Sequence, residues 1–340
     1  MRLSKPLLFN TLLILLTAIV PALSLSFHRQ SRALLCNNSP SHCTTRYSSV
    51  PPQIGSHDSP FIGPLPSQNQ NIATSAQLDR GVRMLQAQTH RAPDDPNAIQ
   101  LCHTDCLLED AGRLQDWLGE IKTWLEREGN GNEVVTLLLT NGDAISMQAF
   151  GEAFKQSEIE KHCFVPGEKE AVVGDLESWP TLSDMIARGK RVVVFMDSGA
   201  EPQEGPPYIL PEFPYFFETP FGVTDPAFPS CSIDRPPNTP SADGRMYIVN
   251  HFLNVEVAPG IKIPDRLRAG RTNSRADVAA QVERCKAVHG GRAASFVLLD
   301  FVDVGDWHRD VKGEAGSEGG FLEKAKEAAC GLLGGFGWGC

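Results

Sequence analysis

Two histidines follow short extended segments in the first third of the chain. His57 stands beside Asp58 just after residues 53–56, and His103 follows residues 99–102. An imidazole at a strand end can take up or release a proton near neutral pH, because its unperturbed pKa is about 6.5. We therefore expect His57 and His103 to carry out acid–base chemistry at one shared mouth.

The elements that position these histidines are predicted by hydrophobic periodicity. Apolar, β-branched runs predict strands buried on both faces, and they cover residues 54–57, 82–88, 99–103, 134–140, 192–197, 247–254 and 296–303, with a weak eighth run at 163–165. Helical patterns lie between them at 110–128, 145–160, 181–189 and 274–288. Strands that alternate with helices predict a mostly parallel sheet, and about eight repeats favour a single distorted (β/α)8 barrel of the TIM type.

Polar side chains gather at the predicted strand ends, where such barrels carry their chemistry. They are His57, Gln88, His103, Asn141, Asp197 and Asp300. Asn141 and Asp197 are candidates to bind substrate hydroxyl groups. Each could equally cap the end of its strand.

One long segment breaks the alternation of strands and helices. Residues 200–243 are rich in proline and aromatic residues, and a loop of this length inside a compact domain usually has a function or is ordered by packing. It is either a lid or lipid-contacting rim over the barrel mouth or a cap that hides apolar barrel surface. We favour the cap.

The two ends of the chain predict three segments and an export route. Residues 1–26 have the basic start, apolar core and small-residue end of a signal peptide. We expect the barrel to occupy residues 27–310, followed by a glycine-rich tail over 311–340. The protein is therefore predicted to be secreted.

All nine cysteines follow the predicted signal peptide, and in an oxidising compartment most should be paired. Candidate pairs are Cys36 with Cys43 and Cys102 with Cys106, and more loosely Cys231 with Cys285. Cys163 is the candidate for a buried unpaired thiol. A zinc site at Cys102 and Cys106 is the rival interpretation, but no matching Cys/His pair follows.

The formal net charge of −10 argues against a nucleic-acid partner, because phosphate backbones are bound by clustered lysines and arginines and no such cluster occurs. It also disfavours adhesion to anionic membranes by charge alone.

Four segments, in this order, resemble the motifs of the phosphatidylinositol-specific phospholipase C-like phosphodiesterases. They are Gly55-Ser56-His57-Asp58-Ser59, Gly81-Val82-Arg83-Met84-Leu85-Gln86-Ala87-Gln88, Leu101-Cys102-His103 and Leu298-Leu299-Asp300-Phe301. The similarity is greatest to the secreted fungal branch and covers residues 33–305. The ordered pair of histidine motifs is far more specific than either motif alone.

This resemblance implies a barrel that cleaves a phosphodiester with two histidines. His57 would remove the proton from an attacking inositol hydroxyl, and His103 would protonate the departing alcohol. Asp300 would orient His57 and stabilise its charged form, and Asp58 would assist on the leaving-group side. We expect no cofactor.

The second strand departs from the family's pattern. Metal-dependent members carry acidic residues there and metal-free bacterial members an arginine, whereas this chain has Gln86 and Gln88. Glutamine can donate hydrogen bonds to a phosphate oxygen but cannot offset its charge or bind calcium strongly. We therefore predict Gln86 and Gln88 as neutral substrate contacts and no metal site. Arg91 would either supply the missing charge or be a solvated loop residue.

The predicted function is a secreted phosphoric diester hydrolase or lyase that acts on an inositol phospholipid or a glycolipid anchor. The alternative is a weak or inactive barrel that binds lipid head groups or cell-wall sugars. A third interpretation, a glycosidase, would need Asp58 and Asp300 to face each other across a sugar. We expect a monomer whose partner is the phosphodiester substrate, met in transient contact with a membrane surface.

Overall fold

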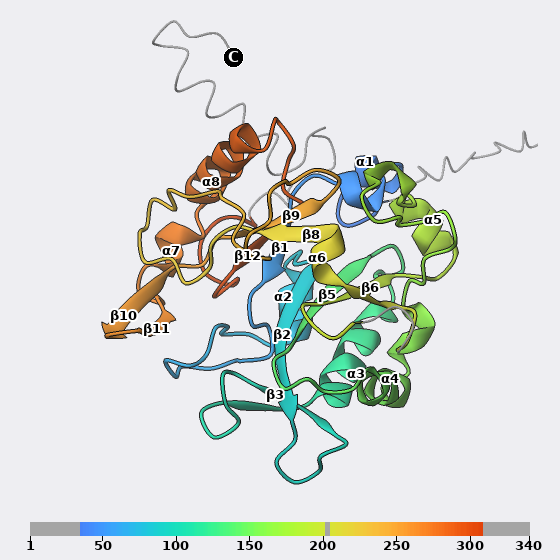
Figure 1. The fold of residues 1–340 in the computed structure, drawn as a ribbon, viewed down its shortest axis with the longest axis horizontal. Coiled ribbons are helices and arrows are strands. Elements are labelled where there is room, and N and C mark those ends of the chain that lie inside the picture. The colour runs from blue at the N-terminus through green and yellow to red at the C-terminus, as the bar shows by residue number, and fades with distance from the viewer. Residues whose placement is uncertain (1–34, 201–204, 309–340) are drawn as a thin grey trace, which may run out of the picture. The chain divides into compact units, whose positions relative to one another are not determined.

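Eight parallel strands form the centre of the protein (Figure 1). The computed structural model describes residues 35–200 and 205–308. The strands are β1 (Gln53–Ser56), β2 (Met84–Arg91), β5 (Val135–Asn141), β6 (Val192–Met196), β7 (Ile209–Pro211), β8 (Phe216–Glu218), β9 (Met246–Asn250) and β12 (Phe296–Leu299). They pair in the order β7-β6-β5-β2-β1-β12-β9-β8, with every neighbouring pair parallel. In the described part of the chain β7 and β8 do not pair, so the curled sheet is a barrel open along one seam. The predicted distorted (β/α)8 fold is confirmed.

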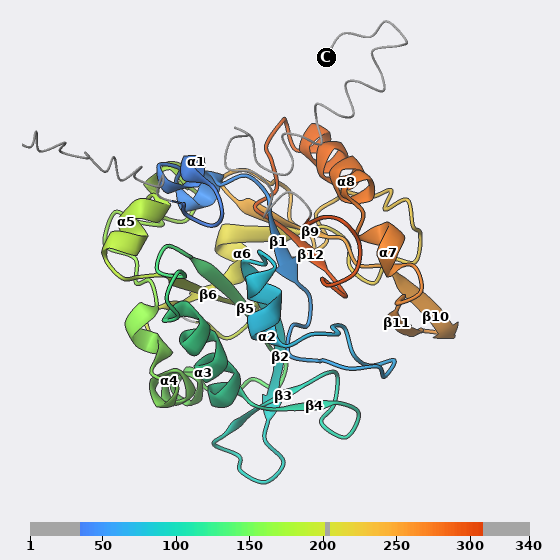
Figure 2. The same ribbon diagram turned by 180° about the vertical axis from the view of Figure 1, so that it is seen from behind.

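Helices cover the outside of the sheet, as Figures 1 and 2 show from opposite sides. The longer ones are α2 (Thr74–Asp79), α3 (Leu114–Leu125), α4 (Met147–Gln156), α5 (Leu182–Ala187) and α8 (Arg275–Val288). Single turns form α1 (Pro40–Cys43), α6 (Glu212–Tyr215), α7 (Ala269–Thr272), η1 (Tyr47–Ser49), η2 (Ile159–His162) and η3 (Leu176–Ser178). Helix α3 buries one stripe that includes Trp117, Ile121 and Trp124, because apolar residues three or four apart share one helix face. No helix in 35–200 or 205–308 is long and apolar enough to cross a membrane.

Alternation along the strands separates two apolar layers. On β2, Leu85 and Ala87 pack outward with the helices, whereas Met84 packs in a second cluster with Leu138 and Phe195. Side chains two apart on a strand share a face, so Met84, Gln86, Gln88 and His90 all belong to the inward face of β2. Its apolar start therefore lies in the core, and its polar end reaches the barrel mouth.

For one segment, the place and direction of the predicted strand were wrong. The segment expected as a buried barrel strand at 99–103 is β3 (Ile99–Cys102), which pairs antiparallel with the distal half of β2 and with β4 (Asp110–Arg113). Only seven residues, 92–98, separate β2 from β3, and a parallel crossover needs about a dozen or more. The predicted helix at 110–128 therefore begins only at Leu114.

The eighth strand was also predicted in the wrong segment. Residues 163–165 make only an isolated bridge between Cys163 and Val192, whereas β7 and β8 lie inside the proline-rich segment. Three-residue strands are too short to show periodicity. The run expected at 247–254 splits into β9 and the first strand of an exposed hairpin, β10 (Asn254–Ala258) with β11 (Ile261–Pro264).

Three disulfides join Cys36 to Cys43, Cys102 to Cys106 and Cys231 to Cys285, which confirms the predicted pairs. Cys163 is buried and unpaired, as expected. The predicted signal peptide, the tail and the domain limits at residues 27 and 310 lie outside the described residues.

Candidate active site

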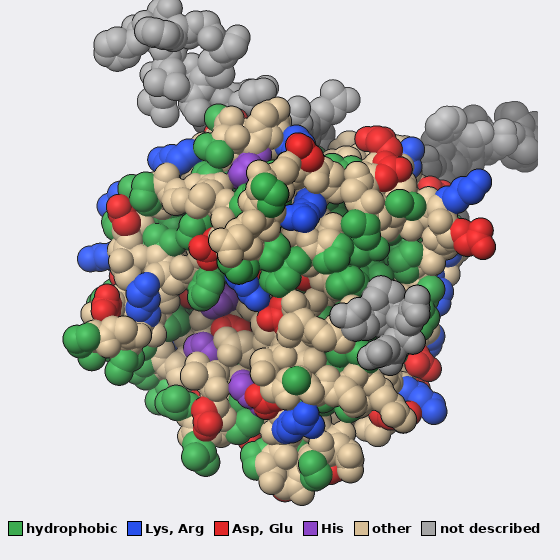
Figure 3. All heavy atoms as spheres, viewed as in Figure 1, with side chains coloured by type: hydrophobic (Ala, Val, Ile, Leu, Met, Phe, Trp, Pro, Cys, Tyr) green, Lys and Arg blue, Asp and Glu red, His purple; other side chains and the backbone are tan. Residues whose placement is uncertain are grey.

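A cavity of about 300 Å³ opens at the carboxyl ends of the strands. Figure 3 looks onto this face and shows histidine side chains within a hollow. Most of its lining is polar: His57, Gln86, Gln88, Thr89, His90, Thr104, Thr140, Gly142, Asp197, Glu218, Phe221, Arg235, Asn250, Phe252 and Leu298. Such a polar hollow suits a hydroxyl-rich or charged ligand better than an apolar one.

His57 is held by partners from two neighbouring strands. It follows β1, and its Nδ1 lies 2.8 Å from Oδ1 of Asp300, which follows the adjacent β12. Asn69 Nδ2 donates to the same carboxylate oxygen at 3.0 Å, and the ring of Phe252 stacks on the imidazole at 3.7 Å. Burial lowers the pKa of His57, but the nearby carboxylates of Asp58 and Asp300 outweigh it and raise the pKa above its usual value. Nδ1 is thus committed to Asp300, and Nε2 is the nitrogen left for chemistry.

Asp58 lies between the two histidines. Its Oδ2 is 3.6 Å from His57 Nε2 and 3.4 Å from His103 Nε2. The side chain is fully buried, and its backbone adopts a positive φ of 46°, a conformation that aspartate tolerates better than most residues. The structure therefore brings His57, Asp58, His103 and Asp300 together, although two long stretches of sequence separate them.

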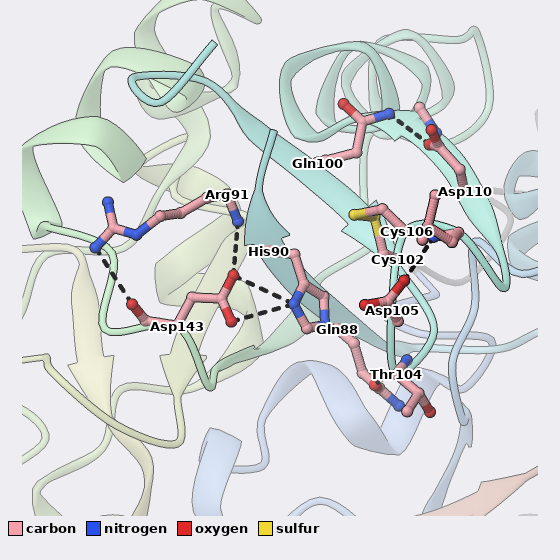
Figure 4. Close-up of a disulfide and its surroundings, with 12 residues drawn as sticks. Gln88, His90, Arg91, Gln100, Cys102, Thr104, Asp105, Cys106, Asp110 and Asp143 are labelled. Atoms are coloured by element: carbon pink, nitrogen blue, oxygen red, sulfur yellow. Dashed lines mark hydrogen bonds and ion pairs between the residues drawn. A yellow bond between two sulfur atoms is a disulfide. The ribbon is translucent and has the colours of Figure 1, made fainter. Parts of the chain in front are cut away.

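His103 is fixed by a tight loop. Its Nδ1 hydrogen-bonds the carbonyl of Ser67, and its ring stacks on Phe61 at 5.2 Å. The Cys102–Cys106 disulfide closes the loop on either side of His103 (Figure 4). His103 thus presents Nε2 toward Asp58.

The two glutamines of β2 both hold Asp58. Gln88 Nε2 donates to Asp58 Oδ2 at 2.8 Å, and Gln88 Oε1 accepts from the backbone N–H of Thr104 at 3.1 Å. Gln86 Oε1 accepts from the backbone N–H of Asp58 at 3.0 Å. Both glutamines line the cavity, but Gln88 has its oxygen and an amide proton committed to the protein.

Of the three other predicted substrate contacts, two lie outside the cavity. Arg91 does not line the cavity, because its guanidinium donates to the carbonyls of Asp143 and Ala144. Asn141 also stays outside, since its side chain pairs with the backbone of Ile145. For Asn141 the geometry is that of a strand-end cap. Asp197 does line the cavity.

A charged cluster in the cavity was missed by the sequence analysis. Arg235 donates to Asp197 Oδ2 at 3.1 Å and to Glu218 Oε1 at 3.2 Å, and Asn250 donates to Glu218 Oε2 at 2.9 Å. Behind it, burial and the neighbouring Glu218 raise the pKa of Glu212 well above its usual range. Arg235 and Glu218 belong to the proline-rich segment, where no periodic signal marks them. Asn250 ends β9, so the rule of polar strand ends could have found it.

Among the described residues, no group of three or more histidine, cysteine, aspartate or glutamate side chains is arranged to hold a metal ion. His57 lines the cavity, and Asp58, His103 and Asp300 are joined to it through the contacts described above.

Comparisons with known proteins agree with this arrangement. The family described as PI-PLC X 1 matches residues 42–312. A PI-PLC X domain-containing protein 1 of Arthroderma benhamiae is 47% identical over 277 residues, covering 80% of this chain and 87% of that protein. An uncharacterized secreted protein of the same fungus is 37% identical, over 81% of this chain and 62% of its own length. The phosphatidylinositol-specific phospholipase C of Listeria monocytogenes has a TM-score of 0.53 at 15% identity, covering 86% of this chain and 99% of that one. At that identity the likeness concerns the fold alone.

Proposed function

The chain belongs to the PI-PLC X family, and we propose that it is a secreted phosphoric diester hydrolase or lyase of the phospholipase C type. The observation that carries this proposal is the pair of imidazole Nε2 atoms that face one buried carboxylate oxygen at 3.6 and 3.4 Å. A base and an acid on opposite sides of one reacting group are what cleavage of a phosphodiester requires. Secretion is supported by the three disulfides and by the secreted relative.

The proposed step is an internal displacement at phosphorus. His57 Nε2 takes the proton of a substrate hydroxyl, whose oxygen attacks phosphorus, and His103 Nε2 gives a proton to the departing alcohol oxygen. Asp300 favours the charged form of His57 that results, and Asp58 stabilises whichever imidazole is charged. The proposed substrate is an inositol phospholipid or a glycolipid anchor, because a neighbouring hydroxyl is then available as nucleophile.

Exposed apolar side chains around the mouth support a lipid substrate. Most of the large exposed hydrophobic residues lie on the loops and the β10–β11 hairpin that follow the strands: Leu65, Leu107, Leu108, Phe221, Val255, Val257, Ile261 and Leu267. Figure 3 shows hydrophobic side chains at lower left, over the β10–β11 hairpin. Clustered exposed apolar surface marks an interaction site. We propose that this rim makes the transient membrane contact.

Substitution of the two histidines tests the proposed function. His57→Ala and His103→Ala should each lower turnover of phosphatidylinositol in mixed vesicles by about 10² to 10⁴-fold, the usual contribution of general acid–base catalysis. His162→Ala is the control, because His162 on η2 pairs with Glu126, whereas His57 and His103 face Asp58. Equal turnover in all three variants, with unchanged thermal unfolding, would refute the mechanism.

The second candidate function is a binder of lipid head groups or cell-wall sugars with little turnover. It is favoured by the hydrogen bonds of Gln86 and Gln88 to Asp58, because these neutral side chains offer no charge to a phosphate. Isothermal titration with inositol phosphates, run beside the vesicle assay, separates the two candidates. Turnover well above background would exclude the binder.

A further inference from the structure

The cavity has a shortage of available positive charge. Asp197 and Glu218 contribute carboxylates to its wall, and the guanidinium of Arg235 already bridges both of them. A phosphodiester carries a negative charge, and an anion in a site of uncompensated carboxylates is repelled. Among the described lining residues, only His57, His90 and Arg235 can carry a positive charge. His57 serves the proposed proton transfer, and Arg235 is shared between two carboxylates. His90 meets one carboxylate through Nδ1 alone and keeps Nε2 for a ligand.

His90 lies on the same face of β2 as the two glutamines. Side chains two apart on a strand share a face, so Gln86, Gln88 and His90 form one inward row, and all three line the cavity. Figure 4 shows the His90 ring between Asp143 on one side and Gln88 on the other. The row thus begins beside Asp58 and ends at His90.

A carboxylate fixes the His90 ring. Its Nδ1 lies 3.2 and 3.3 Å from the two oxygens of Asp143, and the pair is only partly exposed. A carboxylate at Nδ1 orients the ring and leaves Nε2 for a ligand. His90 is therefore a fixed imidazole at the wall of the cavity.

Asp143 is itself held in place by Arg91. Its Oδ2 accepts from the backbone N–H of Arg91 at 2.9 Å. The guanidinium of Arg91 donates to the carbonyls of Asp143 and Ala144 at 3.2 and 2.9 Å. Arg91, for which the sequence left open a phosphate contact or a solvated loop position, thus connects the loop after β5 to the end of β2 and positions Asp143.

We infer that His90, oriented by Asp143, binds a non-bridging oxygen of the substrate phosphate through Nε2. The inference rests on the proposed function. It assigns to His90 the phosphate contact that the neutral side chain of Gln88 cannot supply. Such a charge-assisted hydrogen bond is stronger than a neutral one. His90 is then a phosphate-binding residue, and Asp143 and Arg91 are positioning residues.

The test compares a charged ligand with a neutral one. Isothermal titration with inorganic phosphate and with myo-inositol, at a pH below the usual imidazole pKa of about 6.5, is run on the whole protein and on His90→Gln. Loss of a hydrogen bond to a charged group should weaken phosphate binding about tenfold or more. Binding of myo-inositol should stay the same. Asp143→Asn should weaken phosphate binding in the same direction and by less, because the ring keeps its place and loses only the carboxylate.

Matched controls separate this inference from the proposed function. His162→Gln breaks another histidine–carboxylate pair, the one between His162 and Glu126, which lies away from the cavity. The affinities for phosphate and for myo-inositol should both stay unchanged. If His90→Gln folds normally and binds phosphate as tightly as the parent protein, His90 is not the phosphate contact and the two-histidine mechanism still stands. If the parent protein binds no phosphate and does not turn over phosphatidylinositol, both proposals are wrong. If Arg235→Lys alone weakens phosphate binding, Arg235 is the contact in place of His90.

Discussion

The substitution Asp300→Asn isolates the electrostatic part of the proposed mechanism. Asp300 Oδ1 accepts from His57 Nδ1 at 2.8 Å and from Asn69 Nδ2 at 3.0 Å. Its Oδ2 is buried and has no hydrogen-bond partner among the described residues. An asparagine can therefore keep its oxygen at the Oδ1 position and place its NH₂ group at Oδ2. The shape of the site is kept and the negative charge is lost.

The expected cost follows from that lost charge. A hydrogen bond to a charged group contributes about 1.5–3 kcal/mol, so kcat/KM should fall about 10-fold to 150-fold. The carboxylates of Asp58 and Asp300 raise the pKa of His57 against the effect of burial. Removal of Asp300 therefore lowers that pKa, and the acidic limb of the kcat/KM profile should move to lower pH. The buried NH₂ group without an acceptor should also cost about 1–3 kcal/mol of folding stability.

The assay is the pH profile of kcat/KM on a chromogenic inositol phosphodiester. Asp303→Asn is the control, because Asp303 accepts from Asn71, whereas the carboxylate that contacts His57 Nδ1 is that of Asp300. The control should keep both the rate and the position of the acidic limb. If Asp300→Asn keeps kcat/KM within about twofold and leaves the acidic limb in place, Asp300 does not stabilise the charged form of His57.

Three further predictions concern other parts of the molecule. Burial and the neighbouring Glu218 raise the pKa of Glu212, so the free energy of unfolding should fall as pH rises from about 4.3 through the raised pKa. Glu212→Gln should abolish this pH dependence in urea unfolding. An unchanged pH dependence would contradict the reasoning. Burial raises the pKa of the Cys163 thiol, so peptide mass spectrometry should find Cys163 alkylated by iodoacetamide in urea and not in the native protein; native labelling would show an accessible thiol. Exposed Leu107 and Leu108 adjoin the loop that carries His103, and burial of a leucine side chain contributes about 1.5–3 kcal/mol. Changing both to serine should therefore weaken binding to sedimented vesicles about tenfold or more and leave turnover of a soluble substrate unchanged. Val288→Ser on α8 should change neither quantity.

Long apolar strands and helices could be predicted from the sequence because their periodicity is local. The run Val192–Met196 is buried at every residue, and α3 shows one apolar stripe. The three-residue strands β7 and β8 carry no such signal, and their place depends on pairing with β6 and β9. The connection between β2 and β3 is too short for a parallel crossover, so β3 runs antiparallel to β2. The wrong predictions therefore concern which strands pair in the folded protein, and a local sequence pattern does not contain that information.

The predicted site residues divide in the same way. Residues directly after predicted strands converge on the cavity, as His57 and Asp197 do. Side-chain partners cannot be read from a single sequence. The sequence left two roles open for Asn141 and for Arg91, and only the structure shows that Asn141 caps a strand and that Arg91 bonds to a loop. Arg235 comes from a segment without periodicity, where its position depends on Glu218 and Asp197.

The neutral glutamines of β2 can be understood from the residue that they hold. Asp58 is fully buried, its Oδ1 has no partner among the described residues, and its Oδ2 faces two imidazoles. A cation at the position of Gln88 would neutralise Asp58 and weaken its attraction for a charged imidazole. The amide of Gln88 fixes the carboxylate without cancelling its charge. The arrangement therefore keeps the negative charge between the two histidines and, in the proposed binding mode, leaves the phosphate contact to His90 on the same strand face.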